Sequence, residues 1–424
     1  MKTVYLCIVT HMTSTAVQAK TRSALASYAS FASFGVFWGT WGASIPRIRE
    51  QSGFTDGQLG TALLFIGAGA LPAMLLTGRL VDRFGARRTT AAALSLQAAS
   101  GLFVAATATG LASLCLGLLL VGASSGAADV AINAAAGAAE QEGRKPVITR
   151  SHGTFSTFVV ISSLLAGLLN SYSSAPAVTF GIAAALMLLT ACCLMLPLSL
   201  SKGGRNARPG MTDRPRKPSR AVADRDFPGA GAALPVLPVV LVGFLAALAL
   251  AGENAHQSWA AVYFEDILDT GPDLSSTAPA LFAAVVAVTR FSTGRLNPAH
   301  AARTVILGAA AAAAGAVLVA GSANIATALA GLALAAAGTA VLYPTMLGVV
   351  SRATSEADRG RATARLASIS YLGFLLGPVY VGLWSEAAGL RVAMIAVAAL
   401  GVALLALAPA LLRRVPAGPA PHKG

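Results

Sequence analysis

Residues 78–88 read Gly-Arg-Leu-Val-Asp-Arg-Phe-Gly-Ala-Arg-Arg, and this basic stretch lies between two apolar stretches, 58–78 and 89–108. Each apolar stretch is close to the roughly 20 residues that a helix needs to cross the hydrocarbon core of a bilayer. Short connections rich in arginine are retained on the cytoplasmic side of a membrane. The stretch therefore predicts two membrane-spanning helices joined by a tight cytosolic loop.

The composition of the whole chain agrees with a membrane protein. Of its 424 residues, 55% are hydrophobic and 11% are charged, against about 25% charged residues in soluble domains. So few charges could not cover a soluble surface, which argues against a soluble enzyme, a disordered protein and a secreted disulfide scaffold. The four cysteines lack metal-type spacing with histidine, so we expect neither a metal site nor a redox role for them.

Twelve stretches of the chain have the length and apolar character of a membrane span. They cover residues 25–45, 58–78, 89–108, 111–133, 152–170, 176–198, 235–263, 276–295, 303–321, 324–348, 364–384 and 390–411. The sequence predicts an all-α membrane protein with twelve transmembrane helices in two six-helix bundles.

The basic residues alternate from one connection to the next. With the N-terminus inside, 28 of the 31 Lys and Arg residues fall in cytosolic segments. The net charge of +14 is therefore explained by membrane topology and does not require a nucleic-acid partner. An odd number of spans would destroy this alternation. The count predicts a multi-pass protein of the bacterial plasma membrane with both termini in the cytosol.

The longest connection between spans divides the chain into two halves. It is rich in Pro, Gly and Arg, and such a composition cannot bury a core. The predicted organisation is a cytosolic tail, a six-helix bundle, a disordered basic linker, a second six-helix bundle and a second tail, at residues 1–24, 25–198, 199–233, 234–412 and 413–424. Trp41 and Gly78-Arg79-Leu80 recur as Trp259 and Gly294-Arg295-Leu296, which supports a parallel repeat.

The loop at 78–88 resembles the signature of the major facilitator superfamily at every specified position, between the second and third spans. In that family the loop is a conformational latch, and the resemblance assigns this gating motif to Gly78, Asp82, Arg83, Gly85, Arg87 and Arg88. The equivalent place in the second half reads Asn297-Pro298-Ala299. The resemblance therefore implies an asymmetric latch with its main charge in the first half.

Four further stretches resemble one bacterial branch of that family, the inner-membrane YbjJ-like proteins. They are residues 129–133, 151–156 and 371–378, and Glu253 followed by Trp259. The branch implies no particular substrate. Drug–proton antiporters of the family usually carry a proline motif in the fifth span. Residues 152–170 contain no proline, which argues against a drug antiporter.

Glu253 is the acid that we expect to bind substrate or couple protons. It lies near the middle of the seventh predicted span, and ionisable residues inside a membrane mark functional sites. A carboxylate at that depth must be protonated, paired or bound to a ligand. His256 and Gln257 follow at positions i+3 and i+4, so we place them on the same face. The alternative is a structural hydrogen bond to a neighbouring helix.

Asp129, Asn133 and Glu140 share one face of the fourth span. Asp129 and Asn133 form either a polar wall of a substrate cavity or a salt-bridge site for the arginines of residues 78–88. For Glu140 we favour a place in the latch.

Trp38 and Trp41 also share a face, and Trp38 can stack on a sugar or an aromatic substrate or pack as an ordinary side chain. His152 is expected either to change protonation near neutral pH or to hydrogen-bond the fourth span. Arg290 is expected at the cytosolic end of the eighth span, as a topology or latch residue.

These features favour a secondary active transporter that moves a small solute by alternating access and is coupled to protons. A drug or metabolite efflux antiporter is the alternative, and a membrane enzyme or a sensor fits less well because neither a catalytic constellation nor a signalling domain is visible. The chain has no nucleotide-binding loop. We expect no cofactor and no nucleic-acid partner, and a monomer whose partners are membrane lipids and a small-molecule substrate.

Overall fold

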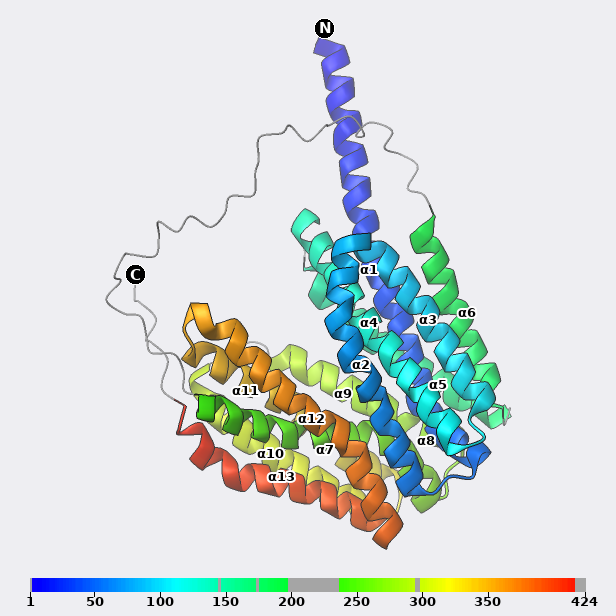
Figure 1. Ribbon diagram of the computed structural model, residues 1–424, viewed down its shortest axis with the longest axis vertical. Coiled ribbons are helices and arrows are strands. Elements are labelled where there is room, and N and C mark those ends of the chain that lie inside the picture. Colours follow the sequence, from blue (N-terminus) through cyan, green and yellow to red (C-terminus); the bar gives the residue numbers. More distant parts are fainter. Residues whose placement is uncertain (1, 144–145, 173–174, 197–235, 294–297, 416–424) are drawn as a thin grey trace.

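The computed structural model describes residues 2–143, 146–172, 175–196, 236–293 and 298–415, and these residues are helical apart from short connections (Figure 1). The helices are α1 Lys2–Ser52, α2 Asp56–Phe84, α3 Ala86–Thr107, α4 Leu111–Gly143, α5 Val147–Tyr172, α6 Pro176–Met195, α7 Val236–Leu268, α8 Pro272–Ser275, α9 Thr277–Thr293, α10 Ala301–Ala320, α11 Ile325–Ala353, α12 Glu356–Ala388 and α13 Leu390–Leu412, with a 3-10 turn at Pro298–His300.

Among the described residues, eleven helical segments are long and apolar enough to cross a membrane: α2 to α7, α8 together with α9, and α10 to α13. The first predicted span, 25–45, lies inside α1, which is less apolar because it is rich in serine and glycine. Ser27, Ser30 and Ser44 are buried against the protein, and Ser27 and Ser30 donate to backbone carbonyls one turn back. Helix α1 therefore lies inside its bundle with its small polar side chains satisfied.

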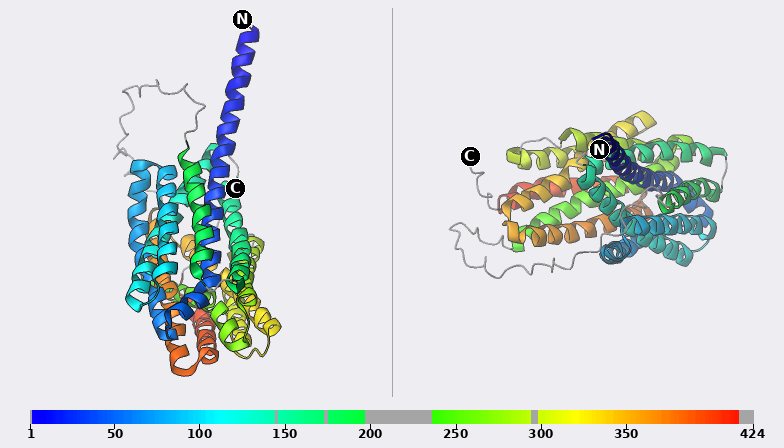
Figure 2. Two further views of the ribbon diagram at one scale, coloured as in Figure 1. Left: turned by 90° about the vertical axis from the view of Figure 1, so that its right-hand side faces the viewer. Right: turned by 90° about the horizontal axis from the view of Figure 1, so that it is seen from above.

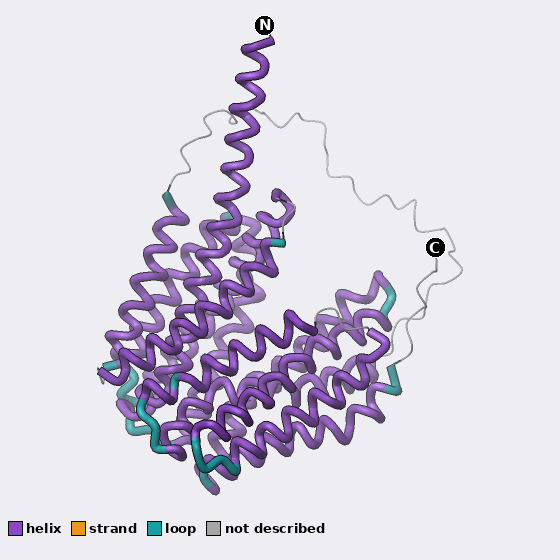
Figure 3. The backbone as a smooth tube through the Cα atoms, turned by 180° about the vertical axis from the view of Figure 1, so that it is seen from behind, coloured by secondary structure: helices purple, strands orange, loops and turns teal. Residues whose placement is uncertain are grey.

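In the described part of the chain, twelve long helices form two bundles, α1 to α6 and α7 to α13. The bundles meet at one end of the molecule and diverge at the other (Figures 1 and 3). We call the first end, with the α1–α2, α7–α8 and α12–α13 connections, the closed end, and the other, with the α2–α3 connection, the open end. Seen from above, the bundles lie side by side (Figure 2). This arrangement confirms the predicted fold class.

One predicted segment, the N-terminal tail, differs in the structure, and others lie outside the described residues. Residues 2–24, expected as a tail, continue α1 as one helix. The predicted linker at 199–233, the repeated Gly294-Arg295-Leu296 and most of the second tail lie outside the described residues.

Candidate functional site

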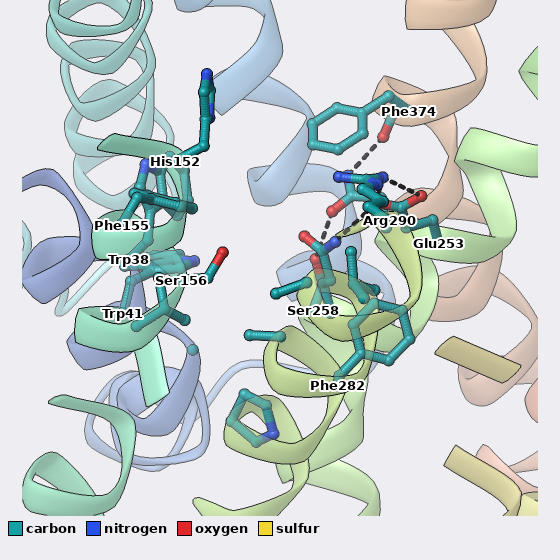
Figure 4. Close-up of a pocket in the computed structure, with 18 of the residues that line it drawn as sticks. Trp38, Trp41, His152, Phe155, Ser156, Glu253, Ser258, Phe282, Arg290 and Phe374 are labelled. Atoms are coloured by element: carbon teal, nitrogen blue, oxygen red, sulfur yellow. Dashed lines mark hydrogen bonds and ion pairs between the residues drawn. The ribbon is translucent and has the colours of Figure 1, made fainter. Parts of the chain in front are cut away.

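A cavity of about 580 Å³ lies between the two bundles. Residues of α1, α2 and α5 line it from the first bundle, and residues of α7, α9 and α12 line it from the second. Figure 4 shows the two walls facing each other, with Trp38, Phe155 and His152 on one side and Glu253, Arg290 and Phe374 on the other. Each bundle therefore contributes one wall of the cavity.

The wall of the second bundle contains a buried ion pair. Glu253 lies midway along α7, and only 7% of its side chain is exposed. Its two carboxylate oxygens accept from Nη2 of Arg290 at 3.0 and 3.2 Å, and Oε1 also accepts from Nε2 of Gln257 at 3.3 Å. The Arg290 side chain is 44% exposed. A solute entering the cavity therefore meets the guanidinium and the Gln257 amide before it meets the carboxylate.

Two more polar side chains continue this wall toward α12. The amide of Asn254 donates to the backbone carbonyl of Phe374 at 2.6 Å, and Ser258 donates to Oδ1 of Asn254 at 3.3 Å. Both residues line the cavity. The wall thus presents a guanidinium, two amides and a hydroxyl, which together can hold an oxygen-rich solute.

The opposite wall is largely aromatic. Trp38 is half-buried and lines the cavity with Phe155, and Phe34 packs against both rings. Trp41 also reaches the cavity but is only 4% exposed, because it packs against Phe180. Trp38 therefore offers more ring surface to the cavity than Trp41, which is chiefly a packing residue.

Asp129 and Asn133 lie behind this wall and do not line the cavity. Nδ2 of Asn133 donates to Oδ1 of Asp129 at 3.1 Å, and Oδ1 of Asn133 lies 3.2 Å from Nε2 of His152. His152 itself lines the cavity. The predicted hydrogen bond of His152 to the fourth span is therefore present, and the polar cluster reaches the cavity only through that ring.

The placement of Arg290 differs from the expectation. It was assigned to the topological or latch arginines because it lies near a helix end, but its side chain lines the cavity and pairs with Glu253. One available signal was that Arg290 falls inside the predicted span 276–295, where a charge requires a partner. The partner itself was not visible, because α7 and α9 are brought together by tertiary packing.

His256 does not share the cavity face with Glu253, contrary to the expectation. It is 2% exposed and packs against the ring of Phe282. In an α-helix, position i+4 lies about 40° from the parent residue, whereas i+3 lies about 60° away on the other side. Gln257 therefore reaches Glu253, and His256 points into the bundle.

The closed end is held by polar contacts that sequence reasoning missed. Arg49, at the end of α1, donates to Asp56 of α2 at 2.9 Å and to Asp266 of α7 at 2.5 Å, so it links the two bundles. Ser385 of α12 donates to the other oxygen of Asp56. We call Arg49, Asp56, Asp266 and Ser385 the closed gate. No motif in the sequence signals these contacts, because the partners lie on different helices.

The motif residues lie at the open end. Gly85, between α2 and α3, has φ of +83°, a conformation that favours glycine, and its N–H closes the last turn of α2. Arg87 donates to the carbonyls of Leu194 and Leu196 at the end of α6. The side chain of Asp82 is exposed, and its carboxylate has no ion pair or hydrogen bond with any described residue.

Glu140 has a different partner from the one expected. Its carboxylate accepts from the backbone N–H of Ile148 at 2.9 Å and so satisfies a free donor at the start of α5. No ion pair joins Glu140 to the arginines of α2 or α3 within the described residues. Its role in a latch stays a prediction.

The chain was compared with known proteins. The model of the Major Facilitator Superfamily matches residues 26–319 and 299–424. An uncharacterised MFS-type transporter of Yersinia pestis is 25% identical over 372 residues, which cover 87% of this chain and 90% of that protein. The membrane protein MosC of Rhizobium meliloti is 27% identical over 372 residues, covering 85% of this chain and 83% of MosC.

Solved structures share the fold. A bacterial homologue of the human lysosomal transporter Spinster superposes with a TM-score of 0.73 at 15% identity, covering 95% of this chain and 99% of that one. A D-xylose–proton symporter gives 0.68 at 13% identity, covering 93% and 97%. The matching family model, together with the two-bundle fold, places this protein in the Major Facilitator Superfamily, a family of membrane transporters and not of enzymes.

Proposed function

We propose that this protein moves a small solute across the bacterial plasma membrane by alternating access and couples the movement to protons. The observation that carries the proposal is the cavity between the bundles, which contains the Glu253–Arg290 pair. A cavity that two bundles share can open to either side as the bundles rock. The relatives and the shared fold support transport, and the solute and the coupling are our proposals.

The open end is assigned to the cytosol. Four arginines lie at that end, Arg79 and Arg83 in the last turns of α2 and Arg87 and Arg88 in the first turn of α3, and basic residues are retained on the cytoplasmic side. In this assignment the structure is inward-facing, and the closed gate faces the outside.

Proton coupling is assigned to Glu253. While its carboxylate is charged, burial makes it dependent on Arg290, because an unpaired charge in a low-dielectric medium is costly. Protonation removes that dependence and releases guanidinium N–H groups toward the cavity. An acceptor group of the solute can then bind Arg290, so proton and solute binding favour each other, as in symport. If the solute instead binds the free carboxylate, the two compete, as in antiport.

The experiment uses purified protein in proteoliposomes. A panel of sugars, amino acids, organic acids and drugs is first screened for thermal stabilisation, and the hit is used as the labelled solute. In Glu253→Gln we expect loss of gradient-driven accumulation and retention of solute exchange, because the shape stays and the titration is removed. The direction of flux under an imposed proton gradient separates symport from antiport.

Glu142→Gln is the matched control, since Glu142 is an exposed acid at the open end. It should leave accumulation and exchange at wild-type levels. If correctly inserted Glu253→Gln protein behaves like this control in accumulation, exchange and affinity, the site assignment is wrong.

A further inference from the structure

We propose that Asn254 is a positioning residue that links the solute cavity to the closed gate through the backbone carbonyl of Phe374. The inference rests on the proposed alternating access. It concerns α12, a helix that both lines the cavity and reaches the gate.

Pro378 interrupts the hydrogen bonds of α12. Proline has no N–H, so the carbonyl four residues earlier, that of Phe374, has no donor within the helix. Nδ2 of Asn254 supplies the missing donor at 2.6 Å. Nε1 of Trp259, also on α7, donates to the carbonyl of Pro378 itself at 3.1 Å. Two side chains of α7 therefore hold the interrupted turn.

The interruption lies where the closest backbone contacts of α12 change from its own bundle to the other one. Before it, Gly373 and Gly377 bring α12 into backbone contact with α7 of its own bundle. Beyond it, Gly382 and Ser385 contact Asp56 of α2, in the other bundle. The first part is anchored, and the second part seals the closed end.

Helix α2, which carries Asp56 of the closed gate, also contacts the interrupted turn of α12 directly. A Cβ added at Gly60 of α2 would lie 3.0 Å from the carbonyl oxygen of Pro378 and 3.0 Å from Cα of Gly382. A small change in direction of α12 at Pro378 therefore changes its fit to α2.

The two donors differ in access to the cavity. Trp259 is fully buried and cannot meet a solute, whereas Asn254 is half-buried and lines the cavity beside Glu253. An acceptor group of a bound solute can therefore draw the Asn254 amide away from Phe374. The turn then loses one of its two ties, and the gate-sealing part of α12 is released while Trp259 holds the pivot.

The test measures the closed end directly. Spin labels are placed at Thr109 and Ala323, which are exposed in the α3–α4 and α10–α11 connections at that end, in protein whose four cysteines are replaced by serine. Without added solute, the wild type should give one short distance. Asn254→Ala should add a longer distance and raise the open-to-closed ratio roughly tenfold, because the carbonyl of Phe374 loses the donor that replaces the missing helical one. Glu142→Gln, at an exposed acid outside the cavity, should stay close to wild type.

The decisive comparison uses Pro378→Ala, which restores the backbone donor to Phe374. In that background Asn254→Ala should no longer change the distance distribution. An equal increase in both backgrounds would overturn the proposal, since Asn254 would then act elsewhere. If Asn254→Ala protein does not fold, Asn254→Leu fills the space and removes the same donor.

Arg49→Ala separates this inference from the proposed function. Breaking the closed gate should lengthen the distance whether or not Asn254 takes part. If Arg49→Ala lengthens it and Asn254→Ala does not, the role of Asn254 is refuted and alternating access stands. If every variant keeps the short distance, the closed end does not open, and both proposals fail.

Discussion

The Glu253–Arg290 pair is the main chemical feature at the scale of single residues. The carboxylate is buried, and the guanidinium is half-exposed to the cavity, so the two partners are unequal. Removing the exposed partner leaves a buried charge, whereas neutralising the buried partner does not. Loss of Arg290 should therefore cost more stability than loss of the charge on Glu253.

Arg290→Ala should lower the free energy of unfolding by roughly 2–4 kcal/mol, somewhat less than for a fully buried pair because solvent reaches the guanidinium. Adding Glu253→Gln should recover much of that loss. Thermal unfolding of the purified protein in detergent measures both effects. Arg361→Ala is the control, since that arginine is 73% exposed in a surface pair with Asp358. Equal shifts for Arg290→Ala and Arg361→Ala would refute the importance of burial.

At the scale of elements, α12 and α2 set how tightly the closed end can seal. Their backbones approach at Gly60 and Gly382, where a side chain would separate them. Small residues permit such close helix contacts in membranes, where packing replaces the hydrophobic effect. The glycines therefore matter for closing this end and not for forming either helix.

Gly382→Ala should open the closed end, because the added Cβ would lie 2.6 Å from the backbone oxygen of Asp56. Such overpacking typically costs about 1–3 kcal/mol, enough to shift the Thr109–Ala323 label distance toward longer values. Gly137→Ala on α4 makes the same change where no atom lies within 4 Å, and it should leave the distance unaltered. A short distance in Gly382→Ala protein would count against the close approach as the seal.

At the scale of the whole molecule, the two ends have opposite states. The closed end is joined by Arg49 and Asp266, while Asp82 at the open end has no partner among the described residues. In a rocking mechanism the bundles approach at one end as they separate at the other. We therefore expect Asp82 to gain its partner only when the open end closes.

Asp82→Asn should slow solute transport several-fold and leave solute affinity and thermal stability near wild type. The reason is that the structure has its open end open, and Asp82 lacks the expected partner in this state. The substitution should therefore affect the step that closes this end. Transport rates in proteoliposomes, with Glu142→Gln as control, measure the effect. Wild-type transport by Asp82→Asn protein would remove the latch role.

The orientation in the membrane is tested by labelling. Single cysteines at Glu142, at the open end, and at Asp273, at the closed end, are exposed on opposite ends of the molecule. An impermeant thiol reagent added to intact cells should label the Asp273 position alone, and opening the cells should add the Glu142 position. Labelling of both from outside would contradict the basic-residue assignment.

The sequence alone determined the features that depend on local, additive properties. Hydrophobic length predicted the spans, each of which overlaps most of one long helix, and the 78–88 pattern predicted the α2–α3 turn, where Gly85 has a positive φ. The position of Glu253 inside a span marked it as costly to leave unpaired, and counting along a helix placed it mid-membrane. Each of these inferences needs only residues that are neighbours in the chain.

Only the tertiary structure decided which side chains meet. Glu253 pairs with Arg290, and Arg49 links to Asp266, across different helices. Asn133 contacts His152, and His256 packs on Phe282, also across helices. Rotation of a helix about its axis by roughly 50° changes which side chains meet, while the hydropathy of its sequence stays the same. The packing of small residues between helices sets that rotation, and no single stretch of sequence contains it.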